Sequence, residues 1–183
     1  IIIKDGGATT DADALPTILT GISYSYCGTA NTVRAAALFT TTGSKVADGT
    51  VGANSITFTG MSGSNVTTND NNSGGAKELI LRVTFNTTVT DNQKLVFTVT
   101  SVTGGAICSY SQFAAANGGG AISENTGTDD NRIEVVADRI VFGTQPITSS
   151  VNTNIPSFTI RFQDANGNLD FDNNRTVTLT LEV

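Results

Sequence analysis

Residues 158–183 read FTIRFQDANGNLDFDNNRTVTLTLEV, and this stretch decides the fold class. Before its loop, the apolar residues Phe158, Ile160 and Phe162 alternate with polar ones. After the loop, alternate positions are again apolar, at Val177, Leu179, Leu181 and Val183. A period of two residues is typical of antiparallel strands with one face buried and the other in water. The stretch therefore predicts a β-hairpin whose two strands flank the loop.

The loop of this hairpin consists of oxygen-bearing side chains and turn-forming residues. Asp and Asn occupy alternate positions, at Asp164, Asn166, Asn168, Asp170 and Asp172. Because Ca²⁺ binds about six to eight oxygen ligands, this spacing predicts a calcium site, with Gly167 at the bend. The alternative is a rigid turn in which the same side chains accept hydrogen bonds from their own backbone. The loop lacks the downstream glutamate of an EF-hand, and both interpretations stay open.

The composition is polar without being strongly charged. Hydrophobic residues make up 38% of the 183 residues and charged residues 14%, whereas charged residues usually account for about a quarter. Thr, Asn, Ser and Gly fill the difference, which favours an extracellular β-protein with hydroxyl-rich strand faces. The net charge of −6 argues against nucleic acid as a partner, because no basic stripe is available to neutralise phosphates. Membrane insertion is not expected, since no apolar run approaches the length of a spanning helix.

Catalysis is not expected from this sequence. The chain has no His, which excludes histidine-based triads and the usual zinc hydrolase sites. The alternative function is that of a carbohydrate-binding module, since such modules are also β-sandwiches. They commonly use exposed aromatic rings as platforms for sugars. The chain has no Trp, which leaves Tyr110 and Phe113 as the candidate platform.

The same alternation recurs along most of the chain and predicts an all-β fold. The residues expected on inward faces are Ile22, Tyr24, Tyr26, Val33, Ala35, Ala37, Phe39, Ile56, Phe58, Leu79, Leu81, Val83, Phe85, Leu95, Phe97 and Val99. The run TGSKVADGTVGAN (residues 42–54) is interpreted as a connection between strands, because it is rich in glycine. The run TVTDNQK (residues 88–94) predicts a tight hairpin turn.

We interpret residues 1–139 as one antiparallel, immunoglobulin-like β-sandwich. Residues 140–183 are either the beginning of a second, truncated immunoglobulin-like module or strands that complete the first. They are too few for an independent domain of this kind, which has about 100 residues. The chain begins near strand-like sequence and ends within it, so we expect it to be a segment of a longer polypeptide.

Cys27 and Cys108 are the only cysteines, and each follows a predicted strand. A disulfide between them would close a loop of about eighty residues and stabilise the fold by about 4 kcal/mol in the chain-entropy model. It would also indicate an oxidising compartment. Two unpaired thiols are the alternative, and the sequence leaves both open.

The N-terminal region contributes two more hypotheses. Asp5, Asp11 and Asp13 form a second acidic cluster, which is either a cation site at a domain junction or part of a solvated linker. Ile1, Ile2 and Ile3 are β-branched, and we expect a strand there that is suited to pairing with an exposed sheet edge in a neighbouring copy. Such pairing would make the protein a self-assembling filament.

Several phrases resemble a known group of proteins: DADALPTILTGISYSY, VRAAALF, SITFTGM, LRVTFNTTVTDNQKLVFTV, RIEVVADRIVFGTQP and DANGNLDFD. They are similar to the immunoglobulin-like β-sandwich repeats of very large secreted or surface-displayed Bacteroidota proteins. The resemblance implies export, often by type IX secretion, and a role as an adhesin, a gliding-associated fibre or another extracellular structural element. Neighbouring copies or tandem modules would be the partners, with surface glycans as a further candidate. A structural or adhesive module at the cell surface is therefore the leading expectation.

Overall fold

The chain divides into two compact units. Unit 1 comprises residues 1–86 and 95–131, and unit 2 comprises residues 87–94 and 132–183. The computed structural model describes residues 1–6, 13–113, 132–150 and 152–180. Within these ranges the fold is all-β. The same ranges contain no helix with the length and hydropathy needed to cross a bilayer.

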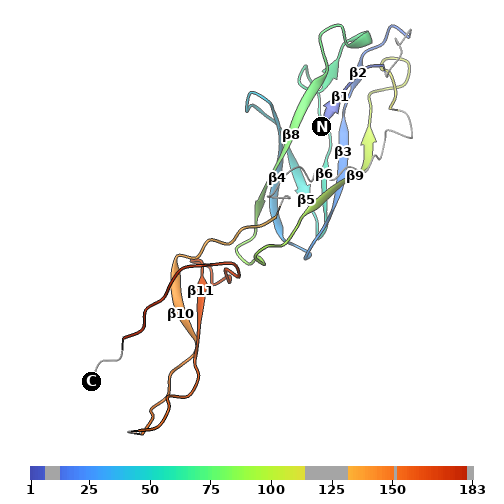
Figure 1. Cartoon of the computed structure of the whole chain (residues 1–183). Coiled ribbons are helices and arrows are strands. Elements are labelled where there is room, and N and C mark those ends of the chain that lie inside the picture. Colours follow the sequence, from blue (N-terminus) through green and yellow to red (C-terminus); the bar gives the residue numbers. More distant parts are fainter. Residues whose placement is uncertain (7–12, 114–131, 151, 181–183) are drawn as a thin grey trace. The chain divides into compact units, whose positions relative to one another are not determined.

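Unit 1 is built on a seven-stranded sheet in which all neighbouring strands are antiparallel. In spatial order the strands are β1 (Ile2–Ile3), β8 (Lys77–Phe85), β4 (Val33–Thr40), β5 (Lys45–Val51), β6 (Ser55–Phe58), β3 (Gly21–Cys27) and β9 (Val96–Thr103). The sheet curls as a half-barrel (Figure 1). A small second sheet pairs β2 (Thr17–Ile18) with β7 (Thr67–Thr68), and the 3₁₀ turn η1 (Asp70–Asn72) follows β7. This confirms the all-β, antiparallel prediction and is consistent with a β-sandwich.

The core of unit 1 lies on the face where most of the alternating residues were expected. Ile22, Tyr24 and Tyr26 of β3 are buried, and so are Ile56 and Phe58 of β6. The rings of Tyr24 and Phe58 meet edge to face, with centroids 6.2 Å apart, an arrangement that stabilises aromatic pairs beyond their buried area. Burial raises the pKa of the Tyr24 hydroxyl, which has no hydrogen-bond partner in the described structure. The alternating pattern of β3 and β6 therefore correctly predicts which of their side chains are buried.

Strand β4 departs from the predicted alternation. Its pairing with β8 shifts register between Val33 and Ala35, so one extra residue separates the two regular halves of the strand. A bulge of this kind moves every later side chain to the opposite face. The structure consequently buries Ala36 and Leu38, and the prediction that Ala35, Ala37 and Phe39 face the core is wrong.

Strand β5 was not predicted as a strand at all. Its sequence KVADGTV lies within the run interpreted as a connection, yet it pairs with both β4 and β6. The presence of a glycine within β5 has a packing reason, because a Cβ at Gly49 would lie 2.8 Å from Cζ of the buried Phe58 ring. Only glycine leaves room for that ring. The glycine that we interpreted as part of a turn is therefore needed for packing inside a strand.

The connection between β8 and β9 is not the predicted hairpin turn. These strands are not neighbours in the sheet, since β8 lies next to one edge and β9 forms the other. Residues 87–94 belong instead to unit 2. Asn92, with a positive φ of 60°, does provide a turn, but the turn does not join paired strands.

Unit 2 contains a two-stranded antiparallel ribbon of β10 (Arg139–Thr144) and β11 (Thr159–Gln163). Residues 173–180 form no strand, so the predicted hairpin between 158–163 and 176–183 is wrong in the described part of the chain. After the loop, the chain is held by Ala137 instead. The Ala137 N–H donates to Asp170 Oδ2 at 2.9 Å, and Arg175 Nη1 donates to the Ala137 carbonyl at 3.4 Å. These bonds direct the chain away from β11.

The predicted disulfide is absent, and both cysteines are exposed free thiols. Cys27 pairs with Val96 at the beginning of β9, whereas Cys108 lies beyond Thr103, which pairs with Gly21 at the other end of β3. The strand between these ends spans about 20 Å at ~3.3 Å per residue. A disulfide needs Cα atoms within about 7 Å, so the antiparallel pairing of β3 and β9 keeps the two thiols apart.

The bulge in β4 can be tested by comparing two adjacent side chains. Leu38→Ala should lower the free energy of unfolding by about 2–5 kcal/mol, because it leaves a cavity in the core. Phe39→Ala should cost clearly less, since Phe39 is only half-buried and its ring lies beneath the Arg82 guanidinium, 4.6 Å from centroid to Cζ. Urea denaturation of both variants gives the two values. A larger loss for Phe39→Ala would mean that the alternation continues through β4 without interruption.

Candidate functional site

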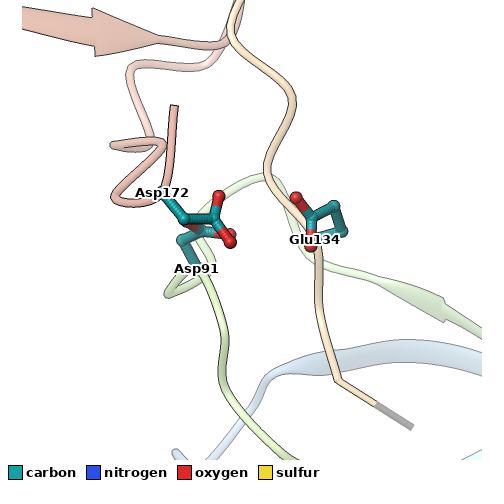
Figure 2. Close-up of side chains that lie close together, drawn as sticks. All are labelled: Asp91, Glu134 and Asp172. Atoms are coloured by element: carbon teal, nitrogen blue, oxygen red, sulfur yellow. The ribbon is translucent and has the colours of Figure 1, made fainter. Parts of the chain in front are cut away.

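Three carboxylates of unit 2, those of Asp91, Glu134 and Asp172, come together from separate stretches of the chain (Figure 2). One oxygen from each lies within 4.8 Å of the others. Asp91 is buried, whereas Glu134 and Asp172 are exposed. Among the described residues this is the one group of three acidic, His or Cys side chains with metal-binding spacing. We refer to it as the carboxylate cluster.

Asp91 joins three segments of unit 2 through its carboxylate. Its Oδ1 accepts the Val135 N–H at 2.9 Å, and its Oδ2 accepts the Phe171 N–H at 2.7 Å. The Asn92 side-chain amide donates to the same Oδ2 at 3.2 Å. A buried carboxylate requires such donors, since leaving a charge unpaired in the interior is costly. The Asp91 oxygens are therefore used as hydrogen-bond acceptors for the backbone.

Arg132 supplies the positive charge of the carboxylate cluster. Its Nη2 lies 3.1 Å from Glu134 Oε2, and its Nη1 lies 3.9 Å from Asp172 Oδ2. Nη1 also donates to Asn92 Oδ1 at 2.6 Å. The guanidinium thus already occupies the position where it offsets the charge of the exposed acids. A metal ion would have to compete with Arg132, so the geometry is that of an ion-pair network.

In the DANGNLDFD loop, the structure brings Asp164, Asn166 and Asn168 together in one turn. Asp164 Oδ1 accepts the backbone N–H groups of Asn166 and Asn168, both at 2.9 Å, and Oδ2 accepts the Asn168 side-chain amide at 2.8 Å. Gly167 has a φ of +89°, which closes the turn. The oxygens of Asp164 are thus used within the loop, in the way that Asp side chains cap turns.

The remaining predicted calcium ligands bond elsewhere in unit 2. The Asn168 side chain is buried, accepts the Val89 N–H at 3.0 Å and donates to the Thr87 carbonyl at 2.8 Å. Asp170 Oδ2 accepts the Asn173 side-chain amide at 2.9 Å as well as the Ala137 N–H. Asp172 belongs to the carboxylate cluster. Calcium binding stays a prediction, and the oxygens it needs already have hydrogen-bond partners.

Hydrogen bonding shifts the acidity of two loop carboxylates. Burial on its own raises the pKa of Asp164, but the bonds from Asn168 and Asn166 outweigh it and hold the pKa below its ordinary value. The pKa of Asp170 is lowered chiefly by the Asn173 side chain and then by the Ala137 N–H. Both groups therefore favour the charged form in the folded state.

Of the second acidic cluster, the structure describes Asp5 and Asp13, and cation binding there stays a prediction. Asp5 is almost fully buried, and its carboxylate accepts the Thr17 hydroxyl and, at 2.9 Å, the Asn71 N–H. Asp13 accepts the Leu15 N–H at 2.8 Å and the Ser111 hydroxyl at 2.9 Å. Asp11 lies outside the described residues. Asp5 and Asp13 each fix the local backbone of unit 1.

Ile1, Ile2 and Ile3, predicted as an assembly strand, pair within their own chain. Ile2 and Ile3 form β1 and lie opposite Glu78 and Lys77 of β8. Ile3 is buried, whereas Ile2 is 60% exposed. The short strand thus covers one edge of the sheet, and its role in assembly stays a prediction.

The aromatic residues suggested as a glycan platform, Tyr110 and Phe113, are both half-buried. The Tyr110 ring lies against the backbone of Gly105, where an added Cβ would come within 2.3 Å of Cδ2. Phe113 lines a cavity with residues of β1 and β9. Each ring therefore packs against its own unit, and glycan binding stays a prediction.

Sequence reasoning missed Asp91, Glu134 and Arg132 as members of one site. Asp91 was interpreted as a turn residue, and an Asp in a polar turn gives no signal that it will be buried. Glu134 and Arg132 lie in the run RIEVV, whose alternating pattern gives no signal of a shared site. The nearest available signal was the adjacent Asp91 and Asn92, which can cap backbone groups on two sides.

The comparisons with known proteins add no assignment. No protein-family model, curated protein or solved structure matches the chain. The resemblance to Bacteroidota surface repeats therefore stays a prediction. The function has to be argued from the geometry of the chain itself.

The role of Asp91 can be tested by replacing it with the isosteric amide. Asp91→Asn turns one acceptor into a donor facing a backbone N–H, so it should destabilise unit 2 by about 2–3 kcal/mol. Asp172→Asn is the matched control from the same cluster. It should cost less than about 1 kcal/mol, because its ion pair with Arg132 is exposed and long. Hydrogen exchange at the amides of Val135 and Phe171 measures the difference, and equal protection in both variants would contradict the assignment.

Acid should weaken unit 2 through Asp164 and Asp170. Because the folded pKa of each is depressed, each contributes stability above its unfolded pKa of about 3.9, and this is lost as the pH falls through the folded value. We expect the free energy of unfolding of unit 2 to decline below about pH 4. Two-dimensional NMR titration of the two carboxyl groups measures this directly. Folded pKa values at or above the ordinary value would contradict it.

Proposed function

We propose that this chain is a structural or adhesive module of an extracellular surface protein or filament, in a role that needs no catalytic step. The observation that carries the proposal is that buried carboxylates connect separate backbone segments through hydrogen bonds. Asp5 and Asp91 are nearly inaccessible to solvent, with exposed fractions of 1% and 4%. Both direct their oxygens to backbone or hydroxyl donors of the same unit.

Such connections between segments suit a module that has to keep its fold under mechanical force. The Asp91 carboxylate connects residues that are 44 and 80 positions apart in the chain. Opening unit 2 therefore requires breaking hydrogen bonds to a charged group, which are about twice as strong as neutral ones. In unit 1, antiparallel strands of up to nine residues share an applied force over many backbone hydrogen bonds.

The outward face of the sheet in unit 1 also supports the proposal. Ser23 of β3 lies opposite Thr57 of β6 on one side and Ser101 of β9 on the other. Ser25 continues the row between Ser55 and Thr98. Hydroxyl pairs across strands stabilise a sheet without adding charge. A neutral, hydroxyl-rich surface of this kind is soluble and suits close packing beside neighbouring modules.

Surface exposure on living cells tests this function. Antibodies raised against the purified chain should label intact, non-permeabilised cells that make the protein, because an extracellular module is accessible to them. Brief protease treatment of the intact cells should remove the label. Immunofluorescence and blotting of the shaved cells measure both effects. Labelling that appears only after permeabilisation would overturn the proposal, and an intracellular protein of the same cells serves as the control.

A further inference from the structure

The two edges of the unit 1 sheet differ in how well they are protected. β1 is only two residues long, and short edge strands rarely recruit partners. β9 has eight residues, VFTVTSVT, without a charge or a proline. It pairs with β3 on one side, and on the other it has no strand partner among the described residues. Its one irregularity is the register shift at Thr100. Within the described ranges, the outer edge of β9 is therefore left without a strand, and it is long enough for strand addition.

A cavity of about 310 Å³ lies at one end of this edge strand. It is lined by residues of both edge strands, including Ile2 of β1 and Val102 of β9, together with Leu19 and Phe113. Lys4 is the one charged residue in its lining. A strand placed along β9 would find hydrogen-bonding groups at its edge and, near Val102, a cavity lined mainly by residues with apolar side chains.

Unit 2 carries a segment with matching properties. Residues 176–180, TVTLT, alternate like a strand but have no strand pairing. Leu179 is 57% exposed and Val177 half-buried, so the apolar face of the segment is largely uncovered. The sequence continues as LEV, which brings in Glu182 as its one charge. That charge is opposite to the charge of Lys4.

We propose that residues 176–180 of one copy add as a strand to the β9 edge of a second copy, with Val177 and Leu179 directed into the cavity. Each copy then has one donor segment and one acceptor edge at different places on its surface. Contacts of this heterologous kind continue from copy to copy, and they build an open filament when the rotation between copies does not close a ring. The inference rests on the proposed function and names its partner, namely a further copy of the same chain.

The test uses the full chain and two complementary variants. The unmodified chain should form a concentration-dependent series of oligomers in sedimentation velocity. The donor variant Val177→Lys/Leu179→Lys should raise the concentration for half-assembly at least about tenfold, because it removes two apolar side chains and places two positive charges in a cavity that Lys4 already lines. Thr176→Lys/Thr178→Lys, which changes the opposite face of the segment, should assemble like the unmodified chain.

An acceptor variant, Val102→Lys, completes the design. Alone it should not assemble, but mixed with the donor variant it should give dimers and nothing larger, since only one functional donor and one functional edge remain. Far-ultraviolet circular dichroism and urea denaturation confirm that each variant is folded.

Three outcomes would overturn strand donation. The first is a chain that stays monomeric at millimolar concentration. The second is a closed dimer unaffected by Val177→Lys/Leu179→Lys, which would indicate symmetric pairing of two β9 edges. The third is assembly beyond the dimer when both variants are mixed. A monomeric chain that still labels the cell surface would reject strand donation alone and leave the proposed function in place.

Discussion

A buried carboxylate must be surrounded by hydrogen-bond donors, and the irregular parts of this protein are organised around that constraint. Asp5 in unit 1 and Asp91 in unit 2 lie where no regular ladder supplies partners, so backbone N–H groups from loops turn toward them. Asp164 does the same for its own turn. A two-stranded ribbon such as the one in unit 2 is only marginally stable on its own. The hydrogen bonds to these carboxylates thus supply part of the stability that a larger sheet would provide.

The regular half of the fold could be predicted because its rule is local. Alternating side chains in β3 and β6 predict their own burial, and the structure confirms it at Ile22 and Phe58. The rule fails where a distant partner intervenes. The bulge in β4 arises in the pairing with β8, and β5 depends on a glycine that makes room for Phe58. In both cases the partner, β8 or Phe58 of β6, lies outside the strand itself.

The candidate site was harder to predict for a chemical reason. Asp and Asn at alternate positions serve equally well as cation ligands and as caps for backbone N–H groups, so DANGNLDFD has the same spacing in either case. What distinguishes the two is where the donors lie, and for Asp170 the donor is Ala137, more than thirty residues away. The carboxylate cluster posed the same difficulty, since Asp91 and Asp172 are far apart in the chain, and so are Asp172 and its ion-pair partner Arg132.

The excursion of residues 87–94 into unit 2 has a consequence for the order of folding. Asp91 precedes its partner Phe171 by 80 residues, so the two ends of this hydrogen bond are synthesised far apart in time. Contacts of such long sequence separation form late, because the intervening chain loses entropy when it closes. Strands β3 to β6 are joined by short connections, so they can pair before the hydrogen bond between Asp91 and Phe171 forms. All strands of the unit 1 sheet have been synthesised by residue 103, whereas the bond between Asp91 and Phe171 can form only after residue 171 is made.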